Sequence, residues 1–454
     1  MTAPTGPLPS FPPKGFERRW WGTVLVVVYA LIVTSGLITA AIANPITDDG
    51  FVYDLGKCFA LVGIALLTMQ FVLSARLQWV ERPFGLDAVF RYHKMMAGLT
   101  AGVLLMHPVL LALGGGGFGL IYSLDAPWYI WFGRVALVLL LAEVVGSAFR
   151  ARLRLEFERW RLLHNQATLI FGLGAIHARV IGGDFEVEAM KVLWVTMVAV
   201  AAGAWLHHKL LVPAVARARS YRVVEIQRET PNVWTLKLKP PPGRARFDYR
   251  PGQFHFLHFR RGRGLPSEEH PFTISSSPTG EHLTSTIKES GDFTRTIGLT
   301  SVGDAVAIRG PFGRFSYTYY RDRRDIVMIA GGIGITPLMS MLRHMRAWPV
   351  EAEVLLLYGN RTEEDIVFWE ELQEMTRRGC PRLKVAHILS QPGESWTGER
   401  GYVDRAAIER LVGGHYSDKM YYICGPPPMM DKVIRDLKTL GVADDHVEFE
   451  RFSL

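Results

Sequence analysis

Four histidines lie inside long apolar stretches of the chain, where an ionisable side chain is costly. His93 and His107 belong to the stretch 88–113, and His164 and His177 belong to the stretch 157–181. Ionisable groups at membrane depth usually have a function, because hydrocarbon does not solvate them. An imidazole can bind a metal or relay a proton. For any one of these histidines, the alternative is a polar contact between helices.

The spacing of the histidines predicts two levels within a membrane. His93 and His107 are 14 residues apart, which advances about 21 Å along a helix and returns the rings to nearly one face. His164 and His177 are 13 apart, which leaves the rings about 140° apart on a regular helix. We therefore expect the second helix to be irregular at Gly172 or Gly174, or the two ligand directions to differ.

Two levels, each with a facing pair of imidazoles, suit two haems stacked across a membrane. We predict that His93 pairs with His164, that His107 pairs with His177, and that each pair holds a haem iron. His207 and His208, at the end of the last apolar stretch, are expected to be interfacial. Lys57, Arg134 and Arg179 are candidates for pairing with haem propionates, or with Asp54 or Glu143.

Six apolar stretches are each long enough to cross a bilayer core, which takes about 20 helical residues. The stretches are 20–43, 53–75, 88–113, 128–149, 157–181 and 190–212. Turn and breaker residues separate them, including Asn44-Pro45 and Gly182-Gly183. We expect a six-helix transmembrane bundle over residues 20–212, preceded by a flexible N-terminal tail over residues 1–19.

The distribution of basic residues predicts the orientation. Lysine and arginine gather before the first stretch and in the second-to-third and fourth-to-fifth connections, whereas 44–52 and 114–127 contain neither. An integral plasma (inner) membrane protein with both termini in the cytoplasm follows. The net charge of +8 then reflects the basic residues that orient the chain in the membrane, and it does not indicate nucleic-acid binding. A signal peptide ending at Ala43 is disfavoured, because its apolar run exceeds about 7–15 residues.

The rest of the composition excludes other classes of protein. Of the 454 residues, 49% are hydrophobic and 21% are charged, which excludes a disordered chain. The three cysteines, Cys58, Cys380 and Cys424, are far apart. They form no disulfide framework and no four-thiolate iron–sulfur site.

The pattern changes after residue 212 from long apolar runs to short strands. Residues 213–322 are expected to form an antiparallel β-barrel domain, with strands at 220–229, 233–239, 253–259, 283–288 and 305–309. From residue 323, strands at 326–330, 353–358, 383–389 and 420–424 alternate with helices at 337–347, 363–378, 404–412 and 427–440. That alternation predicts an α/β Rossmann-like domain over 323–454, with a parallel sheet and helices on both faces.

One motif in the barrel region has the residue types of a flavin site. An aromatic ring flanked by small hydroxyl residues can lie on an isoalloxazine while hydroxyl and amide groups bind its edge. The residues are His270, Pro271, Phe272, Thr273, Ser275 and Ser276. Gly291 and Thr294 follow in a turn whose backbone amides suit a pyrophosphate. The alternative for the motif is an ordinary strand and turn.

Two loops in the last domain suit a dinucleotide. Gly331, Gly332 and Gly334, followed by Thr336 and Pro337, join a strand to a helix and let the backbone approach a pyrophosphate. Cys424, Gly425 and Pro426 follow a later strand, although Cys424 is alternatively a buried core thiol. Arg361 is placed to reach an adenosine ribose or its 2′-phosphate, or is a solvated loop residue.

These motifs, in this order, resemble the NADPH oxidase and ferric reductase family over essentially the whole chain. The resemblance implies that the four histidines bind two haem b groups, and that residues 270–276 and 291–294 bind FAD. It places Cys424 beside the nicotinamide of NADPH or NADH. It also implies that Phe452 stacks on the flavin until nicotinamide displaces it, unless that segment is a final core strand. Leu111 stands where the animal oxidases carry a further histidine.

The implied activity is transmembrane electron transfer from cytoplasmic NAD(P)H to an acceptor outside. A hydride carries two electrons and haem iron takes one, so a flavin must stand between them. Filled axial positions favour outer-sphere reduction. We favour O2 giving superoxide, with a ferric chelate as the alternative small-molecule acceptor and a periplasmic protein partner as a third. A membrane transporter or sensor with a nucleotide-binding tail would instead show no visible absorbance.

Overall fold

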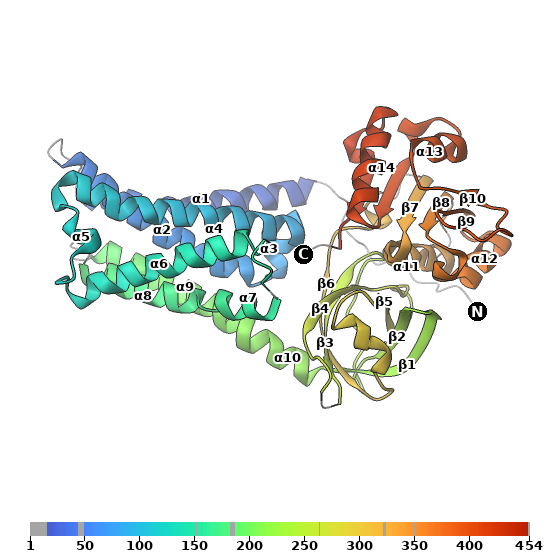
Figure 1. Ribbon diagram of the computed structural model, residues 1–454, viewed down its shortest axis with the longest axis horizontal. Coiled ribbons are helices and arrows are strands. Elements are labelled where there is room, and N and C mark those ends of the chain that lie inside the picture. Colours follow the sequence, from blue (N-terminus) through green and yellow to red (C-terminus); the bar gives the residue numbers. More distant parts are fainter. Residues whose placement is uncertain are drawn as a thin grey trace. The chain divides into compact units, whose positions relative to one another are not determined.

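The computed structural model describes residues 16–43, 50–150, 152–155, 157–181, 187–262, 264–320, 324–348 and 350–452. The chain divides into two compact units, a helical one at Phe16–Val212 and a sheet-containing one at Pro213–Leu454 (Figure 1). Residues 1–15 of the expected tail lie outside the described residues. Helix α1 begins at Phe16, so the tail prediction was too long by four residues.

Five helices of the described part are long and apolar enough to cross a membrane. The corresponding segments are Trp20–Ala41, Phe51–Ser74, Leu86–Gly116, Trp128–Ala148 and Glu188–Ala218. They arise from α1 (Phe16–Ala43), α2 (Phe51–Ser74), α4 (Leu86–Leu111) with the π-helical turn Ala112–Gly116, α6 (Trp128–Ala148), and α9 (Glu188–Leu206) with the π-helical turn His207–Leu211 and α10 (Val212–Ala218). Two short helices, α3 (Gln78–Phe84) and α5 (Gly119–Tyr122), lie in the connections.

The stretch 157–181 forms two helices instead of one. Helix α7 (Phe157–His164) ends at a turn formed by Asn165 and Gln166, and α8 (Ala167–Ile181) follows. Asparagine is a poor helix former, and Lys209 donates to the side-chain Oδ1 of Asn165 at 2.9 Å. The irregularity between His164 and His177 is therefore real. It was wrongly placed at Gly172 or Gly174, which lie inside α8.

The helical unit packs around small and medium-sized side chains. Helix α2 packs along α4, and α6 packs along α8. Their shared core includes Leu67, Ala101, Leu140 and Phe171. The outward faces of α1, α6 and α9 carry exposed valines and leucines, among them Val138, as expected for helices that meet lipid.

The first part of the sheet-containing unit is a six-stranded antiparallel sheet. Its strands are β1 (Tyr221–Thr230), β2 (Val233–Lys239), β3 (Phe254–Arg260), β4 (Glu269–Thr273), β5 (Leu283–Lys288) and β6 (Ala305–Phe312). Their order is β4-β3-β6-β1-β2-β5. The core between them holds Val223, Leu236, Leu257 and Leu283, all with no exposed surface. Strand β4 ends at Thr273, so the flavin-like motif at residues 270–276 lies on β4 and on the segment that follows it.

The second part is a six-stranded parallel sheet with the order β10-β9-β8-β7-β11-β12. Its strands are β7 (Asp325–Gly331), β8 (Glu353–Asn360), β9 (Arg382–Leu389), β10 (Glu399–Arg400), β11 (Met420–Cys424) and β12 (Val447–Glu450). Helices α11 (Ile335–Ala347) and α12 (Trp369–Arg378) cover one face, and α13 (Arg405–Val412) and α14 (Pro427–Thr439) cover the other (Figure 1). The strand order reverses between β7 and β11, and ligands of such sheets bind at that point.

Candidate functional site

The helical unit brings the four histidines together in the two expected pairs. The ring centres of His93 and His164 lie 6.2 Å apart, and those of His107 and His177 lie 6.5 Å apart. One member of each pair comes from α4, near opposite ends of that helix. The partner comes from the end of α7 in one pair and from α8 in the other. The turn at Asn165 and Gln166 allows both partners to face α4 despite their spacing of 13 residues.

Backbone carbonyls set the tautomer of the His107–His177 pair. The Nδ1 of His107 lies 2.8 Å from the carbonyl oxygen of Gly56, and the Nδ1 of His177 lies 2.8 Å from that of Tyr129. A carbonyl oxygen only accepts, so each Nδ1 carries the hydrogen. In a neutral ring, the lone pair is then on Nε2, the nitrogen that is free to bind a metal.

A carboxylate replaces these carbonyls in the His93–His164 pair. The Nδ1 of His164 lies 2.9 Å from Oε1 of Glu143 on α6, and the Glu143 side chain is only 14% exposed. The ring of Trp160 stacks on the ring of His164, with centres 5.0 Å apart and planes 18° apart. The contact with Glu143 is an ion-pair distance, because neither the Nδ1 of His164 nor that of His93 has a hydrogen-bond partner among the described residues.

A glycine on α6 makes room for the ring of His177. A Cβ atom at Gly133 would lie 2.6 Å from two atoms of that ring, closer than side chains tolerate. The hydrogen bond from the ring to Tyr129, four residues earlier on α6, fixes the imidazole against this bare stretch of helix. Helix α6 therefore provides a contact for both paired histidines of the α7–α8 segment, Glu143 for His164 and Tyr129 for His177.

The nearby cations are largely satisfied by protein groups. Lys57 pairs with Asp54 at 3.1 Å, which is one of the two alternatives considered for it. Arg134 donates to the carbonyl oxygens of Gly119, Leu120 and Ser123. Arg134 thus satisfies the carbonyls of the short helix α5 rather than pairing with Glu143, whose Oε1 contacts His164.

The residues of both pairs fit iron porphyrin. Imidazole nitrogens bind a metal at about 2.0–2.1 Å, which separates two opposed ring centres by roughly 6 Å; the observed separations are 6.2 and 6.5 Å. Within the described residues, no group of three or more His, Cys, Asp or Glu side chains could hold a bare metal ion. The role of the four histidines as haem ligands stays a prediction.

The predicted flavin motif forms an aromatic cluster at the edge of the antiparallel sheet. The ring of His270 lies 4.2 Å from that of Phe293, and Phe272 stacks against the same ring at 6.3 Å with planes 25° apart. Glu268 contacts the Nε2 of His270 at 3.0 Å. Pro271 pairs with Phe256 in the register of β3 and β4. Phe293 lies in the turn after β5, so the two predicted flavin segments meet.

The hydroxyl residues of the motif are mostly used to hold it in place. The amides of Ser290 and Gly291 donate to Oγ1 of Thr294 at 2.9 Å, which closes the predicted pyrophosphate turn. Ser276 accepts from the amide of Thr284 at 3.0 Å. Thr273 and Ser275 are buried, and the Oγ of Ser275 bonds the hydroxyls of two β5 threonines.

The two predicted dinucleotide loops touch each other at the reversal of strand order. A Cβ at Gly334 would lie 2.2 Å from the carbonyl oxygen of Cys424, and one at Gly425 would lie 3.0 Å from the amide nitrogen of Gly331. A Cβ at Gly331 would meet Pro426 at 2.7 Å. Glycine is therefore required for the close approach of backbone to backbone here.

The remaining residues of the first loop turn the chain into helix α11. Gly332 has φ +51°, a conformation that favours glycine. Thr336 donates to the carbonyl of Ile333 at 3.0 Å. Thr336 and Pro337 are buried at the start of α11. The N-terminus of that helix offers backbone amides to an anion.

Cys424 is fully buried at the end of β11, with no exposed surface. Burial, with a smaller effect of the Glu450 carboxylate, raises the pKa of its thiol well above the usual value. The thiol is therefore protonated at neutral pH and is a poor nucleophile. That Cys424 lies beside the nicotinamide and takes part in catalysis stays a prediction.

Arg361 and Phe452 lie at exposed positions near the carboxyl ends of the parallel strands. Arg361 follows β8, and its carbonyl accepts from the amide of Gln391 at 2.8 Å. The alternative for the last segment was a final core strand. That strand is β12, which ends at Glu450 and does not include Phe452. The Phe452 side chain is 46% exposed and free of the sheet.

Two side chains of α11 fasten the parallel domain to the flavin-like motif. Ser340 donates to the carbonyl of Ser276 at 2.7 Å, and Arg343 donates to the carbonyl of Ser275 at 2.7 Å. Glu371 on α12 holds the Arg343 guanidinium at 2.6 Å. Because α11 begins at the glycine loop, these bonds tie residues 331–337 to residues 270–276.

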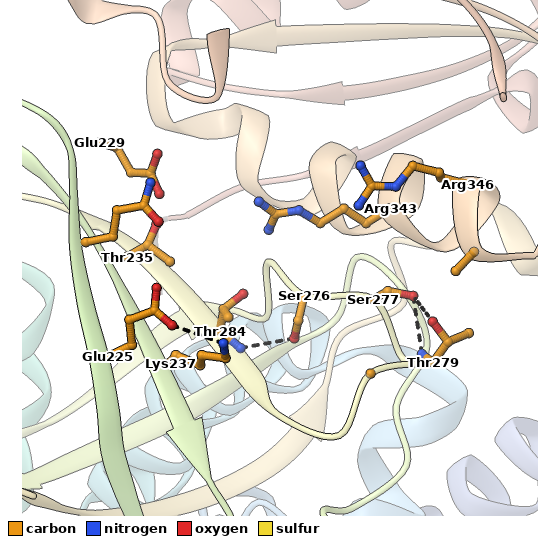
Figure 2. Close-up of a pocket in the computed structure, with 13 residues that line it drawn as sticks. Glu225, Glu229, Thr235, Lys237, Ser276, Ser277, Thr279, Thr284, Arg343 and Arg346 are labelled. Carbon is orange, nitrogen blue, oxygen red and sulfur yellow. Dashed lines mark hydrogen bonds and ion pairs between the residues drawn. The ribbon is translucent and has the colours of Figure 1, made fainter. Parts of the chain in front are cut away.

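A cavity of about 350 Å³ lies beside this contact. Figure 2 shows Arg343 extending from α11 into the space bordered by Ser276 and by Glu229 and Thr235 of the antiparallel sheet. Burial raises the pKa of Glu229. Of the predicted cofactor residues, only Ser276 lines the cavity, so it is separate from the aromatic cluster around Phe293.

Several residues of these sites were missed or misassigned from sequence. Glu143 was visible as a carboxylate within an apolar stretch, but it was assigned to a cation instead of to His164. Phe293 was part of a recognised turn without a role of its own. Gly133, Ser340 and Arg343 have no sequence signal, because their importance comes from contacts with distant residues.

Family comparisons match three consecutive segments of the chain. Residues 59–175 match the ferric reductase like transmembrane component, residues 218–314 match an FAD-binding domain, and residues 328–435 match the oxidoreductase NAD-binding domain. The first segment contains three of the four paired histidines, and His177 lies just beyond its end. The second contains the aromatic cluster, and the third contains both glycine loops.

Curated relatives match part of the chain. NADH-cytochrome b5 reductase 1 of Dictyostelium discoideum is 33% identical over 39% of this chain and 63% of its own length, less than two thirds of it. The protein of the same name from Mortierella alpina is 36% identical over 48% of this chain and 74% of its own length. Among solved structures, the cytochrome b5 reductase domain of Ulva prolifera nitrate reductase is 21% identical, with a TM-score of 0.46, over 51% of this chain and 97% of that one.

Proposed function

Because the chain belongs to the NADPH oxidase and ferric reductase family, we propose that it moves electrons from cytoplasmic NAD(P)H through a membrane to an acceptor outside. The chain is an NAD(P)H-dependent oxidoreductase with FAD- and NAD-binding domains and a ferric-reductase-like membrane component. The observation that carries the proposal is the pair of facing histidines at each of two levels, 6.2 and 6.5 Å between ring centres.

The proposed topology has six crossings, with both termini in the cytoplasm. Helix α8 has 15 residues, about 22 Å at 1.5 Å per residue, which is short of a hydrocarbon core of about 30 Å. We propose that α7 and α8 together make the crossing, with the turn at Asn165 and Gln166 inside it. The proposed domains are 20–212 for the membrane, 213–322 for a FAD-binding barrel and 323–454 for NAD(P)H.

In the membrane domain, the proposed work of the chain is to hold two haem b groups between α4 and the α7–α8 segment. Bound haem supplies a carrier of single electrons. The carbonyls of Gly56 and Tyr129 keep hydrogen on the Nδ1 atoms of His107 and His177, which leaves each Nε2 for iron. Gly133 leaves space for the His177 ring. Because His107 and His177 would both be engaged in holding the iron, an acceptor would meet the edge of the group and not the metal.

In the sheet-containing unit, the proposed work is to position two cofactors for hydride transfer. Bound FAD supplies the exchange between a two-electron donor and one-electron carriers. Phe272 presents a ring to the flavin, with Phe293 and His270 behind it. Gly331 to Pro337 present helix amides to the dinucleotide phosphates, and Gly425 and Pro426 form the nicotinamide side. Ser340 and Arg343 hold these two groups of residues together through hydrogen bonds to the carbonyls of Ser276 and Ser275.

We propose O2, reduced to superoxide, as the acceptor, with a ferric chelate as the second candidate. The second is favoured by Leu111, which packs against Gly56 close to the His107–His177 pair and brings no polar group there. We propose that this pair is the one nearer the outer side. Turnover with a ferric chelate under air and under argon, with and without superoxide dismutase, separates the two. Dismutase-sensitive reporter reduction supports O2. Equal chelate reduction in all conditions overturns O2 in favour of metal reduction.

A further inference from the structure

The two histidine pairs differ in what their Nδ1 atoms contact. Both rings of the His107–His177 pair donate to neutral carbonyl oxygens at 2.8 Å. In the other pair, the Nδ1 of His164 faces the carboxylate of Glu143 at 2.9 Å. We propose that Glu143 is a positioning residue that lowers the reduction potential of the centre held by His93 and His164 below that of the other centre. This inference rests on the proposed haem function.

The sign of the effect follows from the charge beside the ligand. A negative charge next to the ring stabilises ferric iron over ferrous iron, because the ferric centre carries one more positive charge. The Glu143 carboxylate therefore lowers the potential. Second-shell hydrogen bonding and burial are among the means by which a protein sets a haem potential.

Helices α6 and α7 make a second contact one helical turn away from Glu143. On α6, Glu143 and Ser147 are four residues apart, and on α7, Trp160 and His164 are four residues apart. The Nε1 of Trp160 donates to Oγ of Ser147 at 2.9 Å, while Glu143 contacts His164. Trp160 also stacks on the His164 ring at 5.0 Å. The ring therefore cannot turn away from the carboxylate without breaking the stack.

The consequence is a direction for electron movement through the membrane. One electron passes from the centre of lower potential to the centre of higher potential, with no bond made or broken. We propose that the His93–His164 pair lies on the cytoplasmic side and the His107–His177 pair on the outer side. Among the contacts of the described residues, the carboxylate occurs at the cytoplasmic pair. Glu143 thus makes the step towards the outer pair downhill.

Redox titration of the purified, haem-loaded full chain, followed optically and by electron paramagnetic resonance, tests the inference with Glu143→Gln. Glutamine keeps the side-chain length and removes the charge. We expect full haem content in this variant. One midpoint potential should rise by about 59 mV, which makes reduction about tenfold more favourable. The other midpoint potential should be unchanged. The shifted centre must be the one that survives in His107→Ala.

Ser147→Ala is the matched control, because it removes the neighbouring contact of the same two helices without touching the imidazole. Its midpoints are expected to equal those of the wild type. Unshifted midpoints in Glu143→Gln, or an equal shift in Ser147→Ala, would overturn the inference. If Glu143→Gln lost the haem, Glu143→Asp would decide, because it withdraws the carboxylate by one methylene. A few-fold shift there supports the inference, and an unchanged midpoint overturns it.

The wild-type protein separates this inference from the function on which it rests. Wild-type protein without haem would refute the proposed function itself. Wild-type protein with two haems, together with an unshifted Glu143→Gln variant, would refute only the role of the carboxylate.

Discussion

The imidazole of His177 occupies the space that a side chain at Gly133 would need. A Cβ at that position would lie 2.6 Å from the ring. The carbonyl of Tyr129, one turn earlier on α6, holds the ring there at 2.8 Å from Nδ1. Helix α6 contributes no predicted ligand, yet it sets where one ligand lies.

Gly133→Ala should therefore displace His177 and weaken the haem that it is proposed to bind. Second-shell changes at metal sites cost about 10- to 100-fold in affinity, and we expect purified Gly133→Ala to retain roughly one haem of two. Gly146→Ala on the same helix is the control, because a Cβ there meets no atom within 4 Å. The haem-to-protein ratio measures both, and equal ratios would contradict the packing argument.

Alanine at His107 or His164 should remove one haem and stop electron flow at different points. In His107→Ala, NAD(P)H still reduces FAD, but electrons do not reach an outside acceptor. In His164→Ala, transfer stops at the flavin. The control is His207→Ala, at a position expected to bind no iron. Haem content and rapid-mixing spectra are the measurements, and unchanged haem content in both ligand variants would refute the assignment.

Arg343→Ala should loosen the contact between α11 and the flavin-like motif. Loss of a charged hydrogen bond to a buried carbonyl costs about 1–3 kcal/mol, and misplacement of reacting groups by about 1 Å can cost 100-fold in rate. We expect flavin reduction by NADH or NADPH to slow at least tenfold in stopped-flow measurements. Arg346→Ala removes a guanidinium that also pairs with Glu371 and should change the rate little. Equal rates in the two variants would show that the Ser275 contact has no positioning role.

The stability of the antiparallel sheet should depend on pH through His255. This side chain has no exposed surface, its Nε2 lies 2.6 Å from Oγ of Ser285, and burial lowers its pKa to about 3. Between about pH 6.5 and pH 3, the unfolded chain binds a proton that the folded protein does not, so stability falls as the pH falls.

The imidazole should contribute about 2 kcal/mol of this loss by pH 5. His255→Asn should show a correspondingly smaller decrease in the free energy of unfolding between pH 7.5 and pH 5. Denaturant titrations of the full chain, with flavin fluorescence as the signal, measure it. Parallel pH dependences in wild type and variant would exclude His255 as the cause.

Much of the local structure could be predicted because hydrophobic period and turn residues determine it. The strand predicted at 233–239 is β2, the one at 283–288 is β5, and the one at 420–424 is β11, without error in either bound. Five apolar stretches became helices long enough for membrane crossings. The three domain types were recognisable because each has a motif whose spacing depends on local geometry.

The features that the sequence did not predict depend on tertiary contacts. The break after His164 involves no glycine or proline, and its Asn165 is paired with Lys209, which is distant in sequence. Strand β4 was considered only as the alternative to a flavin motif, and its pairing with β3 is a contact between separate segments of the chain. The position of Glu143 opposite His164 depends on how α6 packs against α7, which no spacing within one helix encodes.

We propose that two iron porphyrins lie one above the other between α4 and the α7–α8 segment. The most direct test is the reduced-minus-oxidised absorption spectrum of the purified full chain, with haem and flavin quantified in the same sample. We expect the paired bands of low-spin b-type haem, with two haems for each FAD. A sample that contains flavin and shows no haem bands would contradict it.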